Sequence, residues 1–224
     1  MSECKALMVN RGDDKSISHQ IETIQIDDLP ADGDVLVAVE YSTVNYKDGL
    51  CLGGKGGLVR TYPHIPGIDF AGEVVDSKNT RYAPGDKVVL TGWRVGEIWW
   101  GGYAQYARVK ADWLVPLPDG LTCHQAMAIG TAGITAMLSV LALERHGVYA
   151  EDGPILVTGA GGGVGSVATA VLAAAGFEVA AVTGRPDVAT YLQTLGAASV
   201  IDRDSFMDGD SKALMSEKWA GWRG

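Results

Sequence analysis

A glycine-rich turn between two apolar runs is the part of the chain best suited to chemistry. Residues 155–185 read ILVTGAGGGVGSVATAVLAAAGFEVAAVTGR, in which a β run, Ile155–Thr158, meets the turn Gly159–Gly165, an apolar helix follows, and a second β run covers Glu178–Thr183. Glycine lets the backbone turn tightly and approach an anion, and a helix N-terminus offers N–H groups to phosphate. This order predicts the first βαβ unit of a dinucleotide-binding fold. The expected cofactor contacts in the turn are Gly162, Gly163, Val164 and Gly165.

The match to the G-x-G-x-x-G frame is incomplete. Ala160 stands where the first glycine belongs, whereas Gly162 and Gly165 match. Such a motif alone is compatible with a glycine-rich surface turn, and its place between two strands favours the cofactor site.

The end of the second β run bears on the choice of cofactor. An NAD site usually carries Asp or Glu there to bind the ribose 2′-hydroxyl, but this chain reads Thr183-Gly184-Arg185. Arg185 can bind a 2′-phosphate through a charge-assisted fork, which an acid would repel. We therefore expect NADPH, with Thr183 and Arg185 at its adenosine end; a solvated loop arginine is the alternative.

Composition indicates an ordinary globular protein of one large or two small domains. The chain has 224 residues, 47% hydrophobic and 20% charged, with a net charge of −9 that disfavours nucleic-acid binding. An anionic substrate would need a local basic patch, which Lys47, Lys55, Arg60 and Arg94 could supply.

Cysteine usage and the N-terminus indicate a cytoplasmic protein. Three isolated cysteines, Cys4, Cys51 and Cys123, form no disulfide framework, which fits a reducing compartment. The N-terminus lacks the apolar run of a signal peptide, and the longest apolar stretch, within Val164–Ala175, is too short to cross a bilayer.

The pattern of elements divides the chain into two domains. Residues 1–124 are rich in short β runs separated by Gly, Pro and Asp turns, which predicts a compact β-barrel-like domain. Residues 125–146 are helical in character and lead into a dinucleotide domain over 125–224, with a third strand at Ser199–Ile201. The runs expected in the first domain are Val35–Tyr41, Gly72–Val75, Lys87–Leu90, Ala104–Val109 and Leu114–Pro116.

Five further segments, together with the glycine turn, resemble the acrylyl-CoA reductase branch of the medium-chain dehydrogenase/reductase superfamily, which lies close to the quinone oxidoreductases. These are VNYKDGL (44–50), PHIPGIDFAGEV (63–74), PGDKVVLTGWRVGE (84–97), WGGYAQYARVKADWLVPLP (100–118), AMAIGTAGITAML (126–138) and the turn through TGR. The resemblance implies an α/β plus β fold, in which a GroES-like β-barrel domain precedes an incomplete Rossmann doubly wound domain. It also implies NADPH-dependent reduction of acryloyl-CoA, an acyl-CoA thioester, to propanoyl-CoA.

The resemblance also implies an enzyme without zinc. Zinc-dependent relatives place Cys near the position of Asn45 and a His-Glu pair near Ile68-Asp69, and the residues here supply neither thiolate nor imidazole. A hydride donor and a proton donor suffice for an enoyl thioester, so no Lewis acid is required.

The loop 45–48 faces the nicotinamide in this family. Tyr46 is the candidate acid, Asn45 the candidate positioning donor, and Asp48 is expected to fix the loop; solvent and Tyr62 are the other candidate proton donors. Thr131 is expected to pack near the nicotinamide. An aromatic residue at a domain edge and an ordinary helix threonine are the structural alternatives for Tyr46 and Thr131.

The end of the chain departs from the family pattern. After SEKWAG (216–221), where the family continues into another strand, the sequence ends in Trp222-Arg223-Gly224, which we interpret as a C-terminal truncation. Exposed strand edges would then favour a homo-oligomer with little activity. A quinone or enal reductase, and an inactive fragment that self-associates, remain alternatives; no partnership with nucleic acid or membrane is expected.

Overall fold

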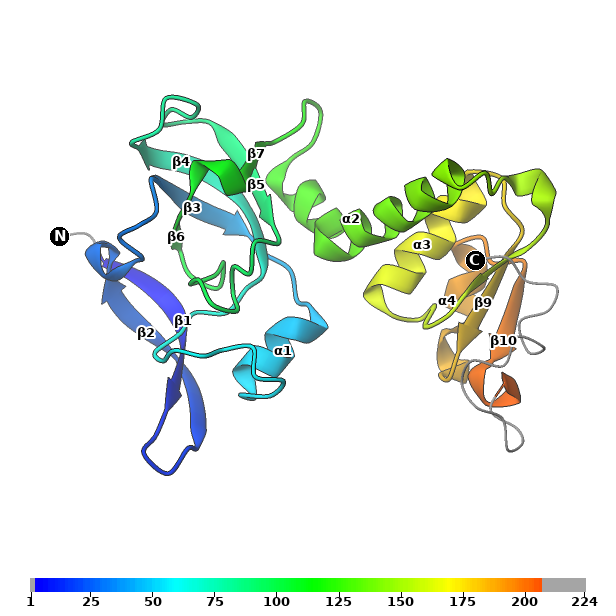
Figure 1. Cartoon of the computed structure of the whole chain (residues 1–224), viewed down its shortest axis with the longest axis horizontal. Coiled ribbons are helices and arrows are strands. Elements are labelled where there is room, and N and C mark those ends of the chain that lie inside the picture. The colour runs from blue at the N-terminus through cyan, green and yellow to red at the C-terminus, as the bar shows by residue number, and fades with distance from the viewer. Residues whose placement is uncertain (1–2, 207–224) are drawn as a thin grey trace. The chain divides into compact units, whose positions relative to one another are not determined.

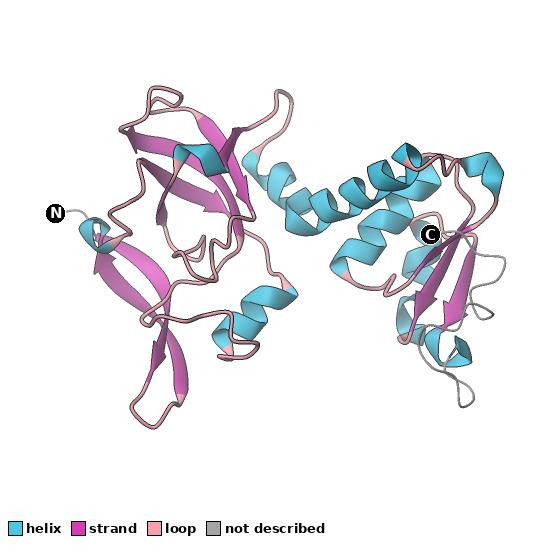
Figure 2. Cartoon of the chain, in the orientation of Figure 1, coloured by secondary structure: helices cyan, strands magenta, loops and turns pink. Residues whose placement is uncertain are grey.

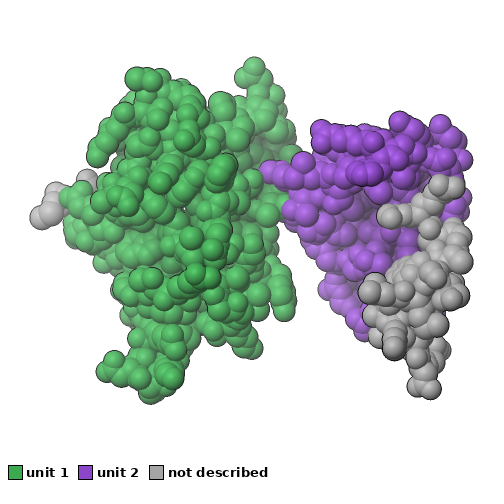
Figure 3. Space-filling model, in the orientation of Figure 1, with its two compact units in different colours: residues 1–131 green, residues 132–224 purple. Residues whose placement is uncertain are grey.

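The computed structural model describes residues 3–206 and divides the chain into two compact units, residues 1–131 and 132–224 (Figure 3). The division falls within a long helix, seven residues beyond the start that the sequence indicates for the second domain. The residues that suggest a truncated chain, 216–224, lie outside the described residues.

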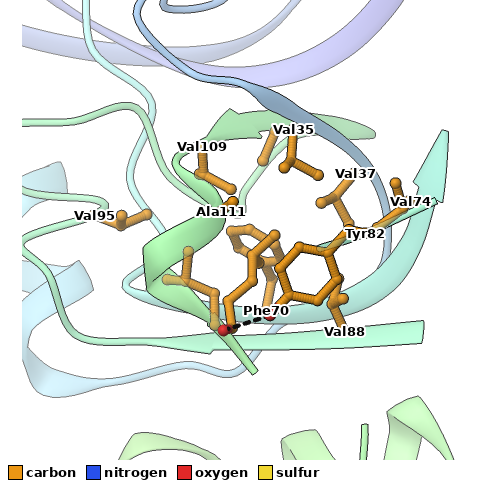
Figure 4. Close-up of a cluster of buried hydrophobic side chains, with 12 residues drawn as sticks. Val35, Val37, Phe70, Val74, Tyr82, Val88, Val95, Val109 and Ala111 are labelled. Atoms are coloured by element: carbon orange, nitrogen blue, oxygen red, sulfur yellow. Dashed lines mark hydrogen bonds between the residues drawn. The ribbon is translucent and has the colours of Figure 1, made fainter. Parts of the chain in front are cut away.

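The first unit is built on a five-stranded antiparallel sheet in the order β6-β3-β4-β5-β7 (Figures 1 and 2). Its inward side chains are mostly valine, which suits a pleated, buried surface. The buried Tyr82 ring packs among them, and its hydroxyl donates to the carbonyl oxygen of Leu114 at 2.7 Å (Figure 4). The strands are β3 (Val35–Tyr41), β4 (Asp69–Ser77), β5 (Lys87–Thr91), β6 (Tyr106–Val109) and β7 (Leu114–Pro116).

A hairpin and a short helix complete the first unit. Strand β1 (Glu3–Arg11) pairs with β2 (Ile17–Gln25) over nine residues each, and α1 (Tyr46–Leu52) follows β3. Ala6 and Met8 of β1 bury their side chains with Leu29 and Ile65 in a second core. Short 3-10 helices occupy Ile26–Asp28 and Ala111–Trp113.

Helix α2 (Cys123–Arg145) breaks at Gly130, whose φ of 53° and ψ of −166° are not helical. Its first part buries Cys123, Ala126 and Met127 in a core of the first unit, and Val140 belongs to the core of the second. By length and composition α2 alone among the described helices could cross a membrane, which corrects the expectation that the longest apolar stretch lies within Val164–Ala175.

The second unit contains a three-stranded parallel sheet in the order β10-β9-β8. In chain order this is 3-2-1, the first half of a Rossmann sheet. Within residues 3–206, β8 pairs on one side only. The elements are β8 (Ile155–Val157), α3 (Gly163–Ala174), β9 (Val179–Thr183), α4 (Ala189–Thr194) and β10 (Ser199–Asp202), with 3-10 helices at Ala150–Asp152, Pro186–Val188 and Arg203–Phe206.

The predicted architecture is confirmed: a β unit precedes a partial Rossmann unit, and the strands expected from the sequence are present within a few residues. Strand β4 is longer than expected, since it begins at Asp69. The β1–β2 hairpin and α1 were not predicted as elements.

Candidate active site and dinucleotide-binding turn

Asp48 fixes the start of α1. Asn45 precedes the helix, and its backbone N–H donates to Asp48 Oδ2 at 2.8 Å. The other oxygen, Oδ1, accepts from the backbone N–H groups of Gly67 at 3.2 Å and Ile68 at 3.0 Å. Burial raises the pKa of Asp48, against the effect of these hydrogen bonds. The expectation that Asp48 fixes the 45–48 loop therefore has a geometric basis, and its part in catalysis stays a proposal.

A second buried carboxylate, Asp69, joins three segments of the first unit. Its Oδ1 accepts from the backbone N–H of Thr43 at 3.2 Å and from Thr43 Oγ1 at 2.6 Å. Its Oδ2 accepts from Asn45 Nδ2 at 3.2 Å and from the backbone N and Oγ1 of Thr131 at 2.9 and 2.6 Å. Asp69 therefore holds Asn45 and Thr131, two predicted site residues, on one carboxylate. We call Asp69, Thr43, Asn45 and Thr131 the Asp69 cluster.

The break in α2 makes the Thr131 contact possible. Because Gly130 leaves the helical conformation, the N–H of Thr131 is directed to Asp69 and the helix restarts there. A carboxylate at a helix N-terminus is favourably placed against the helix dipole. A Cβ at Gly130 would lie 3.0 Å from Thr43 Cγ2, so the break also allows close packing against the cluster.

The Asn45 amide is already engaged. Its Nδ2 donates to Thr43 Oγ1 at 2.8 Å as well as to Asp69 Oδ2, and a side-chain amide has two N–H donors. Asn45 is therefore held rigidly, and in this arrangement the amide nitrogen is committed to the cluster.

Two tyrosines adjoin this network: Tyr46 follows Asn45 in the chain, and Tyr103 contacts Thr43. Tyr46 is 86% exposed. Tyr103, which the sequence analysis did not single out, donates from its hydroxyl to the carbonyl oxygen of Thr43 at 2.9 Å, and burial together with Asp48 raises the pKa of Tyr103 strongly. Tyr62 lies near Arg11, whose Cζ is 6.0 Å from the ring centroid.

Part of the predicted basic patch is neutralised by a buried acid. Glu97 accepts from Lys47 Nζ at 2.8 Å and from Arg94 Nε at 3.4 Å. Burial alone raises the pKa of Glu97, but the hydrogen bonds and charges of Lys47 and Arg94 outweigh it and hold that pKa below its ordinary value. The pairs tie α1 to the turn after β5, where Trp93 and Arg94 both adopt positive φ. Lys55 and Arg60 are exposed.

The glycine turn of the second unit has the geometry that a phosphate site needs. Gly159 has a φ of 60°, and a Cβ at Gly165 would lie 2.4 Å from the carbonyl oxygen of Gly159. Helix α3 begins directly after Gly162, so the N–H groups of Gly163, Val164 and Gly165 form its first turn and have no acceptor within the helix. Gly162, Gly163 and Val164 are exposed, which leaves this terminus accessible.

The strand end lies beside that turn. Thr183 is buried at the end of β9, and its Oγ1 accepts from the backbone N–H of Arg185 at 3.1 Å. The Arg185 guanidinium donates to the carbonyl oxygen of Gly161. The predicted cofactor residues thus form two sets, the turn with Thr183 and Arg185 in the second unit, and Thr131 within the Asp69 cluster of the first. The donors in the second unit are those that a phosphorylated dinucleotide requires.

Across residues 3–206, no three His, Cys, Asp or Glu side chains are grouped so that they could hold a metal ion. Asp69 and Asn45, at positions where zinc-dependent relatives place ligands, bind each other and two threonines. Independence from zinc remains a prediction.

Asp69, Tyr103 and the Glu97 pairs were not singled out from the sequence. Asp69 follows the segment PGI, and an acid that begins an apolar β run, DFAGEV, is a signal that could have singled it out. Its partners lie 24, 26 and 62 positions away, and no local pattern connects them.

Comparison with known proteins agrees with this arrangement. Residues 31–119 match the alcohol dehydrogenase GroES-like domain. The chain is 62% identical over 217 residues to the acrylyl-CoA reductase AcuI of Ruegeria pomeroyi, covering 96% of this chain and 66% of that protein. The chain thus spans slightly less than two thirds of that relative's length.

Two solved structures are closely similar. The yhdH oxidoreductase from Salmonella enterica in complex with NADP superposes with a TM-score of 0.89 at 50% identity, over 94% of this chain and 64% of that one. The Bacillus subtilis protein yhfP with NAD bound has a TM-score of 0.89 at 47% identity, over 96% and 65%; it is described as a putative quinone oxidoreductase.

A GroES-like unit followed by a βαβ unit with a glycine turn is the arrangement of the two-domain dinucleotide-binding class. Residues 31–119 belong to the alcohol dehydrogenase GroES-like domain family, and over almost its whole length the chain is similar to acrylyl-CoA reductases of the medium-chain dehydrogenase/reductase superfamily.

Proposed function

We propose that this protein reduces the carbon–carbon double bond of acryloyl-CoA to give propanoyl-CoA, with NADPH as the reductant. The observation that carries the proposal is the 62% identity to an acrylyl-CoA reductase over 217 residues. Arg185, beside the glycine turn, supports a cofactor with a 2′-phosphate.

In this proposal the chain's own residues do three things. The first turn of α3 and Arg185 bind the phosphates of the dinucleotide, which when bound supplies a hydride for the β-carbon of the alkene. Negative charge then develops on the thioester oxygen, and hydrogen-bond donors near it lower the barrier. A proton is delivered to the α-carbon by Tyr46 or by solvent.

The Asp69 cluster would act by positioning. It holds Asn45 and Thr131 at fixed places, and Asp48 holds the segment that carries Tyr46. A preorganised site avoids the reorganisation that a flexible loop would need at the moment of reaction.

A quinone or enal reductase is the second candidate. The putative quinone oxidoreductase YhfP, 48% identical over 217 residues, favours it. The proposal of an acryloyl-CoA reductase also includes four further predictions: an acyl-CoA thioester substrate, a cytoplasmic location, a homo-oligomer, and no resident metal. An inactive, self-associating fragment is the non-enzymatic alternative.

The test is a turnover panel. The 224-residue chain and a version extended to the length of its relatives are given NADPH with acryloyl-CoA, with crotonaldehyde and with a quinone, and NADPH absorbance and product mass are recorded. Faster formation of propanoyl-CoA than of any other product supports the proposal, and faster quinone reduction replaces it with the second candidate. Inactivity of both proteins on every acceptor, with a concentration-dependent mass, would support the fragment.

A further inference from the structure

The turn after β5 holds a tryptophan ring in water. Trp93 is 58% exposed, although the free energy of an indole favours burial. Its ring is stacked on that of Trp113, with centroids 6.2 Å apart and planes inclined by 16°. Among residues 3–206, Trp113 supplies the only ring contact of Trp93, and no cation lies over it. The face of Trp93 that is turned away from Trp113 is therefore open to a flat ligand.

The backbone of this turn is strained. Gly92, Trp93 and Arg94 have φ values of 85°, 57° and 60°. A residue with a Cβ adopts positive φ only at a cost in free energy, and Trp93 and Arg94 both have one. Burial does not account for this cost, since both side chains are exposed. Strained residues with exposed side chains are typical of sites that clamp a ligand.

Cations lie beside the two stacked rings. Lys110 Nζ is 5.6 Å from the ring centroid of Trp113 and 5.8 Å from that of Trp99. Arg94 follows Trp93 in the chain, and its side chain is 48% exposed. We call Trp93, Trp113, Arg94 and Lys110 the Trp93 platform.

The Trp93 platform carries positive charge, in a chain whose net charge is −9. Arg94 shares the single carboxylate of Glu97 with Lys47. Asp112 pairs instead with Arg81, and Lys110 has no ion pair among residues 3–206. The Trp93 platform therefore suits a ligand that combines a flat ring with negative charge.

The Trp93 platform also adjoins the segment that carries Tyr46. Glu97 accepts from Lys47 of α1 at 2.8 Å and from Arg94 at 3.4 Å, so one carboxylate joins α1 to the platform. A Cβ at Gly96 would lie 2.7 Å from the carbonyl carbon of Gly67, which shows how closely the turn is packed. A molecule that reaches from the candidate site to this turn stays on one compact unit.

We infer that the Trp93 platform binds the nucleotide end of the coenzyme A thioester, with adenine stacked on Trp93 and phosphates held by Arg94 and Lys110. The inference rests on the proposed function, which supplies a substrate with an adenine ring and several phosphates at the end opposite the thioester. Aromatic side chains bind bases by stacking, and cations bind phosphates through charge-assisted hydrogen bonds. Binding of this remote, unreactive end provides free energy that can be used to place the reacting carbons.

Binding of free coenzyme A to the 224-residue chain tests this independently of turnover. Coenzyme A and NADPH are titrated by calorimetry into the parent and the variants. Trp93→Asn removes the ring, and asparagine tolerates positive φ better than other residues with a Cβ, so the turn keeps its shape. Coenzyme A affinity should fall about 10-fold, the loss of one stacked base, while NADPH affinity stays unchanged. Trp93→Phe keeps a stacking face and should give a smaller loss.

Two further variants serve as a second test and a control. Lys110→Gln should weaken coenzyme A binding and reduce its dependence on salt, since a charged contact to phosphate is removed. Tyr149→Ala removes an aromatic ring that is 51% exposed from the second unit and should leave coenzyme A affinity unchanged. Urea denaturation checks that each variant is folded.

The extended enzyme offers a kinetic comparison. Trp93→Asn should raise KM for acryloyl-CoA about 10-fold and leave turnover of acryloyl-pantetheine, which lacks the nucleotide, at the parent value. A general defect of the fold would lower both.

Unchanged coenzyme A affinity in Trp93→Asn overturns the inference. A parent chain that does not bind coenzyme A overturns it as well, and acryloyl-CoA reduction by the extended enzyme would then leave the proposed reaction standing. Equal losses of coenzyme A and NADPH affinity in Trp93→Asn also overturn it, because the change would not be specific to this site. Coenzyme A binding that depends on Trp93 supports the inference even where acryloyl-CoA is not reduced.

Discussion

Asp69 is the residue on which the candidate site of the first unit depends most. Its side chain is fully buried and accepts five hydrogen bonds from Thr43, Asn45 and Thr131. A partly buried donor that loses its acceptor costs free energy, so removal of the carboxylate should destabilise the positions of all three partners.

Asp69→Asn should lower the free energy of unfolding by about 1.5–3 kcal/mol. The substitution replaces one carboxylate oxygen, an acceptor, by an NH2 group, which is a donor and faces other donors. In the extended enzyme we expect a fall in kcat with a smaller change in KM, since Asn45 and Thr131 lose their common anchor. Urea denaturation and steady-state kinetics measure both. The exposed change Asp119→Asn is the control; equal effects of the two substitutions would contradict a role for the cluster.

Tyr46→Phe tests the proton donor. Tyr46 is 86% exposed, so the change should leave the unfolding free energy unaltered. If Tyr46 supplies the proton, turnover of the extended enzyme should drop by about 10²–10⁴-fold, the usual range for general acid catalysis. Turnover unchanged at every pH would assign the proton to solvent or to another group.

At the scale of elements, the break in α2 is the feature that shapes the site. Gly130→Ala places a Cβ on a residue with a φ of 53° and a ψ of −166°, which costs about 1–3 kcal/mol, and brings it to 3.0 Å from Thr43 Cγ2. Gly120→Ala is the matched control, because Gly120 has a φ of 84° with open space around it. Both variants should be less stable, but only Gly130→Ala should reduce turnover of the extended enzyme, as measured in the acryloyl-CoA assay.

Equal loss of turnover in the two variants would mean that strain, and not the packing at Thr43, is the cause.

The elements that the sequence predicts best are those with a local signal. The glycine turn, β3 and β9 follow from glycine spacing and from apolar runs, because both depend on residues adjacent in the chain. The β1–β2 hairpin was missed because β2, ISHQIETIQ, is largely exposed and polar, and its place is set by pairing with β1. The Asp69 cluster was missed for the same kind of reason, since its hydrogen bonds connect three separate segments.

At the scale of the whole molecule, one buried histidine should make stability depend on pH. His64 is 2% exposed, and its Nε2 has no hydrogen-bond partner among residues 3–206. Burial lowers the pKa of His64, against a hydrogen bond with the backbone of Gly96. The unfolded chain therefore takes up a proton at higher pH than the folded protein, so the free energy of unfolding should fall as pH drops below about 6.5.

The predicted slope is at most about 1.4 kcal/mol per pH unit, and it ends below the folded-state pKa. Thermal or urea unfolding across pH measures it. His64→Gln should flatten the profile in this window, whereas the exposed His146→Gln should keep the parent slope. A parent profile that is retained in His64→Gln would assign the acid sensitivity to other groups.

The three buried cysteines allow the opening of one part of the molecule to be measured as a rate of thiol alkylation. Cys4, Cys51 and Cys123 are free, at most 4% exposed, and all in the first unit. Burial raises the pKa of each thiol, and it raises the pKa of Cys51 to about 11. Because the thiolate is the reactive form, alkylation must wait for the backbone around each sulfur to open. The chain has no other cysteine, so the rate of alkylation, followed by intact mass, reports opening of residues 1–131 while the βαβ unit contributes no signal. Native protein should label slowly, and rapid uptake of one label would identify the segment of this unit that opens first.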